Sequence, residues 1–329
     1  MLNKKAFKVA TLALTLGTSI GFASFASATT EMKAAFNQSK FNPQYLALED
    51  FGQKLNEQTD GRYHLTIYAN ELLGDQRASL ELVQSGAIQM AIVANPLVEN
   101  YNSDFGVLAL PYIYNGPKHQ EAVYTSNVLD DLFASSKKFG FEVLTAYTAG
   151  ARSMYTKKAP VTSIADMKGQ KIRVMQSDTM ISMLACMGGT GVPMGQGEVY
   201  TAIQQGVLDG AENNEITYAD LKHYEVAPFY SRTRHVMVAD LVVINNDFID
   251  AMTPSDQVIL RKLAKESTTT EFTIWNNNIS KAIAVAKANG ATFTDVDIAP
   301  FQKSCKPLQE KLLVKPAQIA LFKTIRSLG

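Results

Sequence analysis

The chain has 329 residues, with 31 basic and 31 acidic side chains, so its formal net charge is zero. This balance gives no basic field of the kind that binds nucleic acid or an anionic membrane surface. The length is too great for one small core and predicts two domains of ordinary size.

The first 28 residues have the features of a signal peptide. Three lysines (Lys4, Lys5 and Lys8) precede a largely apolar segment over residues 9–25, and Ala26-Ser27-Ala28 matches a signal-peptidase site. We expect cleavage after this site and export to the periplasm, which leaves 28 basic and 31 acidic side chains, a net charge of about −3. A membrane anchor is the alternative, but the small, Ser- and Thr-rich composition disfavours it.

Strand and helix patterns alternate from residue 29 to about residue 148. Pro43 can begin a helix, because proline is tolerated in the first turn, and Asp75 can cap another through its carboxylate. This alternation is typical of an α/β domain. The predicted strands are residues 63–68, 87–93, 107–110 and 141–147, and the predicted helices are residues 43–57, 75–84 and 117–137.

Residues 168–214 contain a β-α-β-α-β pattern, which predicts a parallel or mixed sheet. In such sheets ligands bind beyond the carboxyl ends of the strands, and Arg173 and Asn213 both fall near predicted strand ends. An arginine fork suits a carboxylate, and an asparagine amide can both donate and accept. The predicted strands are residues 171–174, 191–194 and 207–213, and the predicted helices are residues 178–187, after an N-cap at Ser177, and 198–205.

The last third of the chain predicts elements long enough to connect two domains. Residues 234–245 form a long extended run that can link both sheets. A helix start at 253–256 is followed by no proline or glycine before Gly290. At 1.5 Å per residue this helix is up to roughly 50 Å long, so it is either one kinked helix across both domains or two helices. Residues 291–329 predict one strand and terminal helices.

Two cysteines, Cys186 and Cys305, occur in the chain. An exported chain could pair them, but Cys186 lies in a Met-rich helical pattern, and we expect a buried small apolar residue there rather than half of a disulfide. No C-x-x-C or His-rich cluster occurs, so we expect no metal site. The G-x-S-x-G, P-loop and H-E-x-x-H motifs are absent, and Pro193 interrupts the glycines at 188–191, so we expect neither an enzyme nor a cofactor.

Three segments resemble the signature region of the DctP-type solute-binding proteins of TRAP (tripartite ATP-independent periplasmic) transporters. They are KIRV at 171–174, VPM at 192–194 and EVYTAIQQGVLDGAEN at 198–213. Leu73-Gly74-Asp75 and the run LVQSGAIQMAIV at 82–93 also resemble this family, so the resemblance covers nearly the whole exported chain.

The resemblance implies an α/β, two-lobed periplasmic binding protein of the Venus-flytrap type, with crossing strands and a long helix that spans both lobes. We expect lobe I to contain residues 29–149 and about 239–278. Lobe II would then contain residues 150–238 and about 279–329, with the C-terminal helices.

The family pattern also implies a set of ligand-binding residues in lobe II. Arg173, in the KIRV strand, would form a bidentate pair with a ligand carboxylate, and Arg152 and Asn213 would reach the same group. Asn214 and Glu215 would face ligand hydroxyls.

Four further residues are candidates for ligand binding that also have alternative interpretations. Gln196 stands where many members of the family carry a bulky or aromatic side chain, which predicts a more polar wall here. In lobe I, Asn95, Asp75 and Gln76 are candidates, with a pre-proline turn for Asn95 and a helix N-cap for the other two as alternative roles.

We therefore expect an exported protein that closes by a hinge around one organic acid and delivers it to a small and a large TRAP membrane subunit. The run ENNEITYADLKHYEV at 212–226 resembles members of the family that take uronates and other sugar acids. A C4-dicarboxylate or keto acid is the alternative ligand. Two other classes stay open, an exported enzyme acting on a small acid and a sensory binding protein that partners a receptor kinase.

Overall fold

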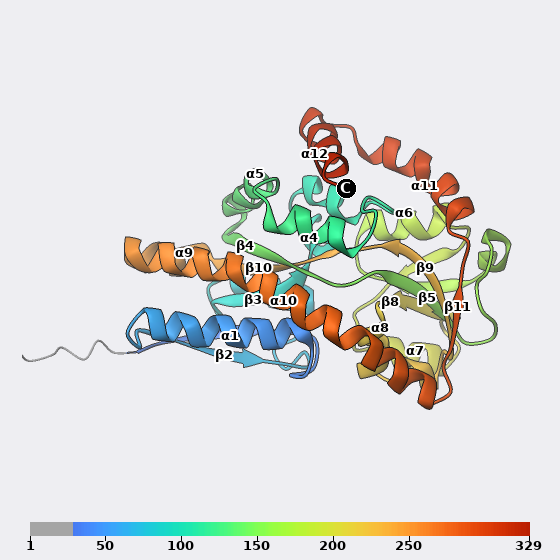
Figure 1. Ribbon diagram of the computed structural model, residues 1–329, viewed down its shortest axis with the longest axis horizontal. Coiled ribbons are helices and arrows are strands. Elements are labelled where there is room, and N and C mark those ends of the chain that lie inside the picture. Colours follow the sequence, from blue (N-terminus) through green and yellow to red (C-terminus); the bar gives the residue numbers. More distant parts are fainter. Residues whose placement is uncertain (1–28) are drawn as a thin grey trace, which may run out of the picture.

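The computed structural model describes residues 29–329, and the predicted signal peptide lies outside them. Two mixed sheets, each covered by helices, form two lobes (Figure 1). Lobe I contains the sheet β2-β1-β3-β10-β4, and lobe II contains the sheet β11-β9-β5-β8-β6-β7. The strands are β1 (Thr30–Ala35), β2 (Tyr63–Tyr68), β3 (Met90–Ala94), β4 (Phe141–Thr148), β5 (Arg152–Thr156), β6 (Lys171–Val174), β7 (Thr190–Pro193), β8 (Gly210–Asn213), β9 (Phe229–Val236), β10 (Ala239–Asn245) and β11 (Thr292–Asp295).

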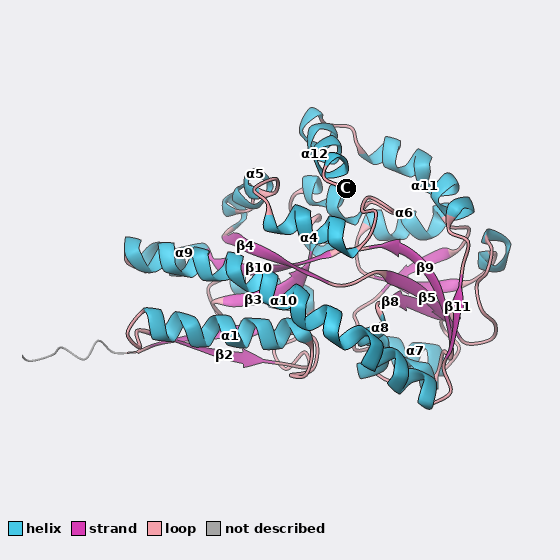
Figure 2. Cartoon of the chain, viewed as in Figure 1, coloured by secondary structure: helices cyan, strands magenta, loops and turns pink. Residues whose placement is uncertain are grey.

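The chain crosses between the sheets twice through paired strands (Figure 2). Residues 149–151 join β4 to β5, and residues 237–238 join β9 to β10. The run predicted as one extended segment over 234–245 is therefore two strands in different sheets, and its predicted role as a link between the sheets is confirmed. β4 and β10 pair antiparallel within lobe I, so the two crossings leave that lobe side by side.

One helix spans both lobes (Figure 1). α10 (Pro254–Ala288) is continuous over 35 residues, so the choice between one helix and two is settled in favour of one. The hydroxyl of Thr253 accepts from the Asp256 amide and caps its start. Within a single turn the helix passes from Phe272, in the core of lobe I, to Trp275, in the core of lobe II.

The other helices cover the sheets. The N-caps predicted at Asp75 and Ser177 are confirmed, since their side chains accept from the amides of Ala78 and Met180. The α-helices are α1 (Pro43–Gln58), α2 (Gln76–Gln84), α3 (Asn95–Val98), α4 (Pro117–Thr125), α5 (Asp130–Ala134), α6 (Asp178–Cys186), α7 (Val199–Gln204), α8 (Glu215–Asp220), α9 (Asn246–Ala251), α11 (Ala299–Leu312) and α12 (Pro316–Ser327), and the 3₁₀ helices are η1 (Ser103–Ala109), η2 (Lys137–Phe139), η3 (Ile164–Met167) and η4 (His223–Glu225).

Two predicted elements of lobe I are wrong. Residues 107–110, predicted as a strand, are mostly the end of η1, because a short buried apolar run does not distinguish a strand from a helical turn. Residues 117–137, predicted as one helix, form α4, α5 and the start of η2. The hydroxyl of Ser126 donates to the Val123 carbonyl and accepts from the Val128 amide, a local turn that ends α4.

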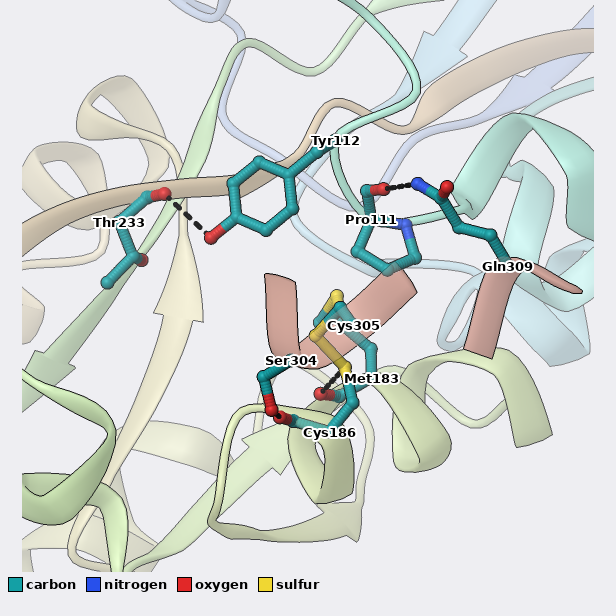
Figure 3. Close-up of a disulfide and its surroundings, with 8 residues drawn as sticks. All are labelled: Pro111, Tyr112, Met183, Cys186, Thr233, Ser304, Cys305 and Gln309. Carbon is teal, nitrogen blue, oxygen red and sulfur yellow. Dashed lines mark hydrogen bonds between the residues drawn. A yellow bond between two sulfur atoms is a disulfide. The ribbon is translucent and has the colours of Figure 1, made fainter. Parts of the chain in front are cut away.

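Cys186 and Cys305 form a disulfide that joins α6 to α11, so the expectation of an unpaired Cys186 is wrong (Figure 3). Their Cα atoms lie 5.0 Å apart although 119 residues separate them in the chain, which is why sequence alone did not bring them together. The Gln309 side chain also donates to the Pro111 carbonyl at 2.6 Å (Figure 3). α11 is thus held to lobe II by the disulfide and to lobe I by this hydrogen bond.

The last helix returns to lobe I. The carbonyl of Ile325 lies 2.7 Å from Nε2 of His119, and Arg326 donates to the Ile113 carbonyl at 2.8 Å. The C-terminal helices, grouped with lobe II in the predicted division, therefore bridge the lobes. No helix within residues 29–329 is long and apolar enough to cross a membrane.

Candidate ligand-binding site

Two adjoining cavities lie between the lobes and share Gln76, Met175 and Gln196 in their walls. We call them together the interlobe cavity. One part is lined by Arg173 of lobe II with Glu71 and Asp75 of lobe I. The other part is lined by Arg152, Asn213 and Asn214 of lobe II with Gln38 of lobe I, and each part has about 20 Å³ of internal space. The lobes are therefore closed on each other here.

Arg173 presents a buried cationic fork to this cavity. It lies on β6 between the core residues Ile172 and Val174, and its side chain is almost fully buried. Nε donates to the Met194 carbonyl at 2.8 Å, which orients the guanidinium, while the two terminal nitrogens have no partner within residues 29–329. Burial lowers the pKa of Arg173, and the charge of Arg152 adds to this, but an arginine stays protonated. A buried cation with free donors is suited to an anion.

Arg152 is different, because the protein uses most of its donors. Its Nε and Nη2 donate to the two carboxylate oxygens of Glu212 at 2.6 and 2.7 Å, and Nη2 also donates to the Glu212 carbonyl. Nη1 donates to Oδ1 of Asn213 at 2.8 Å. Of the five N–H groups of an arginine, one on Nη1 is left for a ligand.

Glu212 pairs with Arg152, and His235 contacts Glu212. His235 Nε2 lies 3.4 Å from Glu212, and its Nδ1 lies 2.8 Å from the Thr233 hydroxyl. Burial would raise the pKa of Glu212, but the charge of Arg152 and hydrogen bonds from His235 and Arg152 outweigh it and hold the pKa at about 2. Burial lowers the pKa of His235, so its imidazole is neutral at pH 7. Arg152 and Glu212 therefore form a buried ion pair, and the neutral His235 adds a hydrogen bond to the Glu212 carboxylate.

The two asparagines have different roles. Oδ1 of Asn213 accepts from Arg152 and from the backbone and side chain of Asn214, so its Nδ2 is the group left to face the cavity. Asn214 is the N-cap of α8, and its side chain accepts from the Thr217 amide at 2.8 Å and donates to Asn213 and to the Thr217 hydroxyl. Asn214 therefore positions Asn213 and begins the helix.

Unsatisfied polar atoms gather at the interlobe cavity. Among residues 29–329, seven buried side-chain nitrogen or oxygen atoms lack a hydrogen-bond partner, and four belong to side chains that line this cavity. Two are acceptors, Oε1 of Gln38 and Oε1 of Glu71, and two are donors, Nε2 of Gln196 and Nε1 of Trp275. A buried polar group without a partner costs about 1–3 kcal/mol, so a ligand that satisfies these atoms gains affinity.

Two of the sequence candidates lie elsewhere. Asn95 is fully buried outside the interlobe cavity, where it donates to the Phe105 carbonyl and accepts from the Ala239 amide, each at 2.9 Å. It fixes the start of β10. Glu215 lines a separate cavity of about 270 Å³ under α10, whose other walls include Arg234 and Trp275. The structure thus does not bring Asn95 or Glu215 to the side chains around Arg173.

Asp75, Gln76 and Gln196 do reach the cavity wall. One oxygen of Asp75 also caps α2, and Oε1 of Gln76 accepts from the Ala94 amide at 2.9 Å. Sequence reasoning missed Gln38, Glu71 and Trp275, because nothing in their local pattern marks a site. The first two come from loops after β1 and β2, and Trp275 comes from α10, a hundred residues from Arg173.

A family model described as bacterial extracellular solute-binding protein, family 7 (DctP), matches residues 35–315. The uncharacterized protein YiiZ of Salmonella typhimurium (strain LT2) is 33% identical over 322 residues, which cover 97% of each chain. The 2,3-diketo-L-gulonate-binding periplasmic protein YiaO of Escherichia coli (strain K12) is 28% identical over 306 residues, which cover 93% of each chain.

Solved structures of similar proteins have the same architecture. A TRAP periplasmic solute-binding protein from Anaerococcus prevotii DSM 20548, with bound D-glucuronate, has a TM-score of 0.88 and 33% identity over 91% of this chain and 98% of that chain. One from Xanthobacter autotrophicus Py2, with bound β-D-galacturonate, has a TM-score of 0.87 and 30% identity over 90% and 99% of the two chains. The predicted two-lobed binding-protein fold is thereby confirmed.

Proposed function

We propose, because this chain belongs to the DctP family of bacterial extracellular solute-binding proteins, that it captures a hexuronate or a related sugar acid and delivers it to a TRAP transporter. The observation that carries the choice of ligand is the composition of the interlobe cavity. A buried arginine with free donors faces the same space as two unsatisfied acceptors and two unsatisfied donors. A molecule with one carboxylate and several hydroxyls complements this set.

In the proposed complex, the ligand carboxylate receives two hydrogen bonds from the terminal nitrogens of Arg173. Nδ2 of Asn213 and the remaining N–H of Arg152 are available to the same group or to a neighbouring oxygen. Hydroxyls can donate to Gln38 and Glu71 and accept from Gln196. An unsubstituted C4-dicarboxylate or a simple keto acid has no hydroxyl to donate to the two acceptors, so sugar acids are favoured.

Contacts across the rim support capture by hinge closure. Asn37 of lobe I donates to Gln196 of lobe II at 3.4 Å, and the Thr179 hydroxyl of lobe II donates to Glu99 of lobe I at 2.8 Å. The chain crossings at 149–151 and 237–238 are the segments about which the lobes can turn. Closure excludes water from the cavity, which strengthens the pairing of Arg173 with a carboxylate.

The ligands of similar proteins support the same chemistry. The structures from A. prevotii and X. autotrophicus hold glucuronate and galacturonate, and the E. coli relative is named for 2,3-diketo-L-gulonate, all of them six-carbon sugar acids. The partners in this proposal are a small and a large membrane subunit of a TRAP transporter, which receive the acid from the protein in the periplasm. Binding without turnover is the expected activity.

Calorimetric titration of residues 29–329 with D-glucuronate, D-galacturonate, 2,3-diketo-L-gulonate, succinate and pyruvate tests the proposal. We expect at least one sugar acid to bind well above succinate and pyruvate. Arg173→Lys should weaken binding about 10–100-fold, because it keeps the charge but loses the planar fork. Arg77→Lys, at an exposed arginine outside the interlobe cavity, is the matched control. Preferential binding of succinate or pyruvate, or unchanged affinity in Arg173→Lys, would overturn the proposed ligand class or the proposed anchor respectively.

A further inference from the structure

The loop after β2 places a carboxylate in the interlobe cavity by means of an unusual backbone. Asn70 and Glu71 have φ of +57° and +56°, a left-handed conformation that is uncommon outside glycine. Hydrogen bonds from the Asn70 amide to the Gln38 carbonyl at 2.8 Å and from the Glu71 amide to the Phe36 carbonyl at 3.2 Å hold the turn. Such strained positions persist where the surrounding structure fixes them, and they concentrate at functional sites.

The Glu71 carboxylate reaches across to lobe II. A Cβ atom added at Gly197 would lie 2.6 Å from Oε2 of Glu71, so a larger residue there would push the carboxylate out of this position. The backbone of Gly197 lowers the pKa of this carboxylate. The other oxygen, Oε1, is buried in the wall of the cavity and has no partner within residues 29–329.

The charges around the cavity are therefore arranged with opposite signs on the two lobes. Arg173 and Arg152 face it from lobe II, and Glu71, Asp75 and Asp240 face it from lobe I. Burial and the charge of Asp75 raise the pKa of Glu71, whereas Arg173 across the cavity lowers it. An acid with one carboxylate matches this arrangement. A second carboxylate at the other end of the ligand would have to lie against Glu71 and Asp75.

We infer that Glu71 sets the specificity of the site, by accepting a hydrogen bond from a hydroxyl of the ligand and by repelling a second carboxylate. This inference rests on the proposed function. Like charges brought together in a buried interface are strongly disfavoured, and a site discriminates by such repulsion as well as by attraction. We expect D-glucarate, which has a second carboxylate in place of the aldehyde carbon of D-glucuronate, to bind at least about 100-fold more weakly than D-glucuronate.

A purely mechanical role is the competing explanation. Glu71 touches lobe II at Gly197, so it could act as a latch that stabilises the closed form whatever the ligand. Glu99 offers a matched control, because its carboxylate also joins the lobes, through the hydroxyls of Ser177 and Thr179, but does not line the interlobe cavity. Loss of a latch weakens all ligands alike, whereas loss of a specificity determinant changes their ratio.

The test measures the affinities of D-glucuronate and D-glucarate at pH 7 for the wild type, Glu71→Gln and Glu99→Gln. Because the two ligands are the same in each variant, any difference in their shape cancels when the ratios are compared. We expect Glu71→Gln to reduce the preference for glucuronate at least tenfold, with tighter binding of glucarate, and Glu99→Gln to leave the ratio unchanged.

The outcomes are distinguishable. If Glu71→Gln weakens both acids equally, the inference is overturned in favour of a latch. If Glu71→Gln changes neither affinity, or if D-glucarate binding is undetectable in both wild type and variant, the inference is also overturned. Failure of the wild type to bind any sugar acid would instead count against the proposed function. Thermal unfolding of each variant checks that the fold is intact.

Discussion

Glu212→Gln should destabilise the protein by about 3 kcal/mol at pH 7. Glu212 is fully buried, and its carboxylate is held by Arg152 and His235. The substitution keeps the size of the side chain but removes its charge, which leaves the buried guanidinium of Arg152 without a counter-ion. Breaking one partner of a buried ion pair typically costs about 3–5 kcal/mol.

The pKa of Glu212 gives a similar magnitude. It falls from its ordinary value of 4.5 to about 2 in the folded protein. At about 1.4 kcal/mol for each tenfold change in the dissociation constant, this corresponds to about 3 kcal/mol. Because the pKa is lower in the folded than in the unfolded chain, this stability is fully present above about pH 4.5 and is lost as the pH falls toward 2.

Urea unfolding of the wild type and Glu212→Gln at several values between pH 7 and pH 3 measures this contribution. Other carboxylates also titrate in this range, so the quantity of interest is the difference between the two proteins at each pH. We expect the difference to be about 3 kcal/mol at pH 7 and to shrink steadily below pH 4.5. A difference under about 1 kcal/mol at pH 7, or one that stays constant down to pH 3, would refute the reasoning.

Two further predictions concern stability away from the ligand. Burial, with a further contribution from nearby Asp240, raises the pKa of Glu271 well above its ordinary value, so the folded protein holds a proton that the unfolded chain loses as the pH rises above about 4.5. Glu271→Gln should therefore be more stable than the wild type at pH 7 and 8 but not at pH 4. Thermal unfolding at each pH measures this difference. Equal stability at all three pH values would mean that Glu271 is ionised in the folded protein. Replacing Cys186 and Cys305 with alanine removes a disulfide that closes a loop of 119 residues. This should lower the free energy of unfolding, measured in urea, by up to about 5 kcal/mol. Sugar-acid affinity should stay within about threefold of the wild type. A much larger loss of affinity would show that the disulfide also shapes the cavity.

Strand-borne features were the most predictable part of this molecule. β6 occurs where the sequence predicts it, and β8 covers only the last four residues of the strand predicted over 207–213. Because ligands bind beyond the carboxyl ends of such strands, the sequence already predicts Arg173 and Asn213 near one ligand crevice. The structure adds what no local pattern contains. Glu212 lies directly under Arg152, so most of the guanidinium that we expected to face a ligand is committed to the protein.

The half of the cavity contributed by lobe I was much less predictable. Gln38 and Glu71 lie in irregular loops, and their meeting with Gln196 depends on how the two lobes close. Asn95 illustrates the opposite difficulty. A polar residue after a buried strand was a reasonable ligand candidate, but the Phe105 carbonyl and the Ala239 amide use both ends of its amide. Tertiary contacts of this kind cannot be predicted from the spacing or periodicity of residues in the sequence.

The continuity of α10 has a mechanical consequence for the hinge closure proposed above. A helix of 35 residues, about 52 Å long, is anchored in the core of lobe I at Phe272 and in the core of lobe II at Trp275. Any change in the angle between the lobes must therefore bend this rod near residues 272–275 or slide one of its ends over the sheet beneath it. Bending a helix raises its conformational energy. In the proposed mechanism, closure that bends α10 would use part of the free energy of ligand binding to bend it.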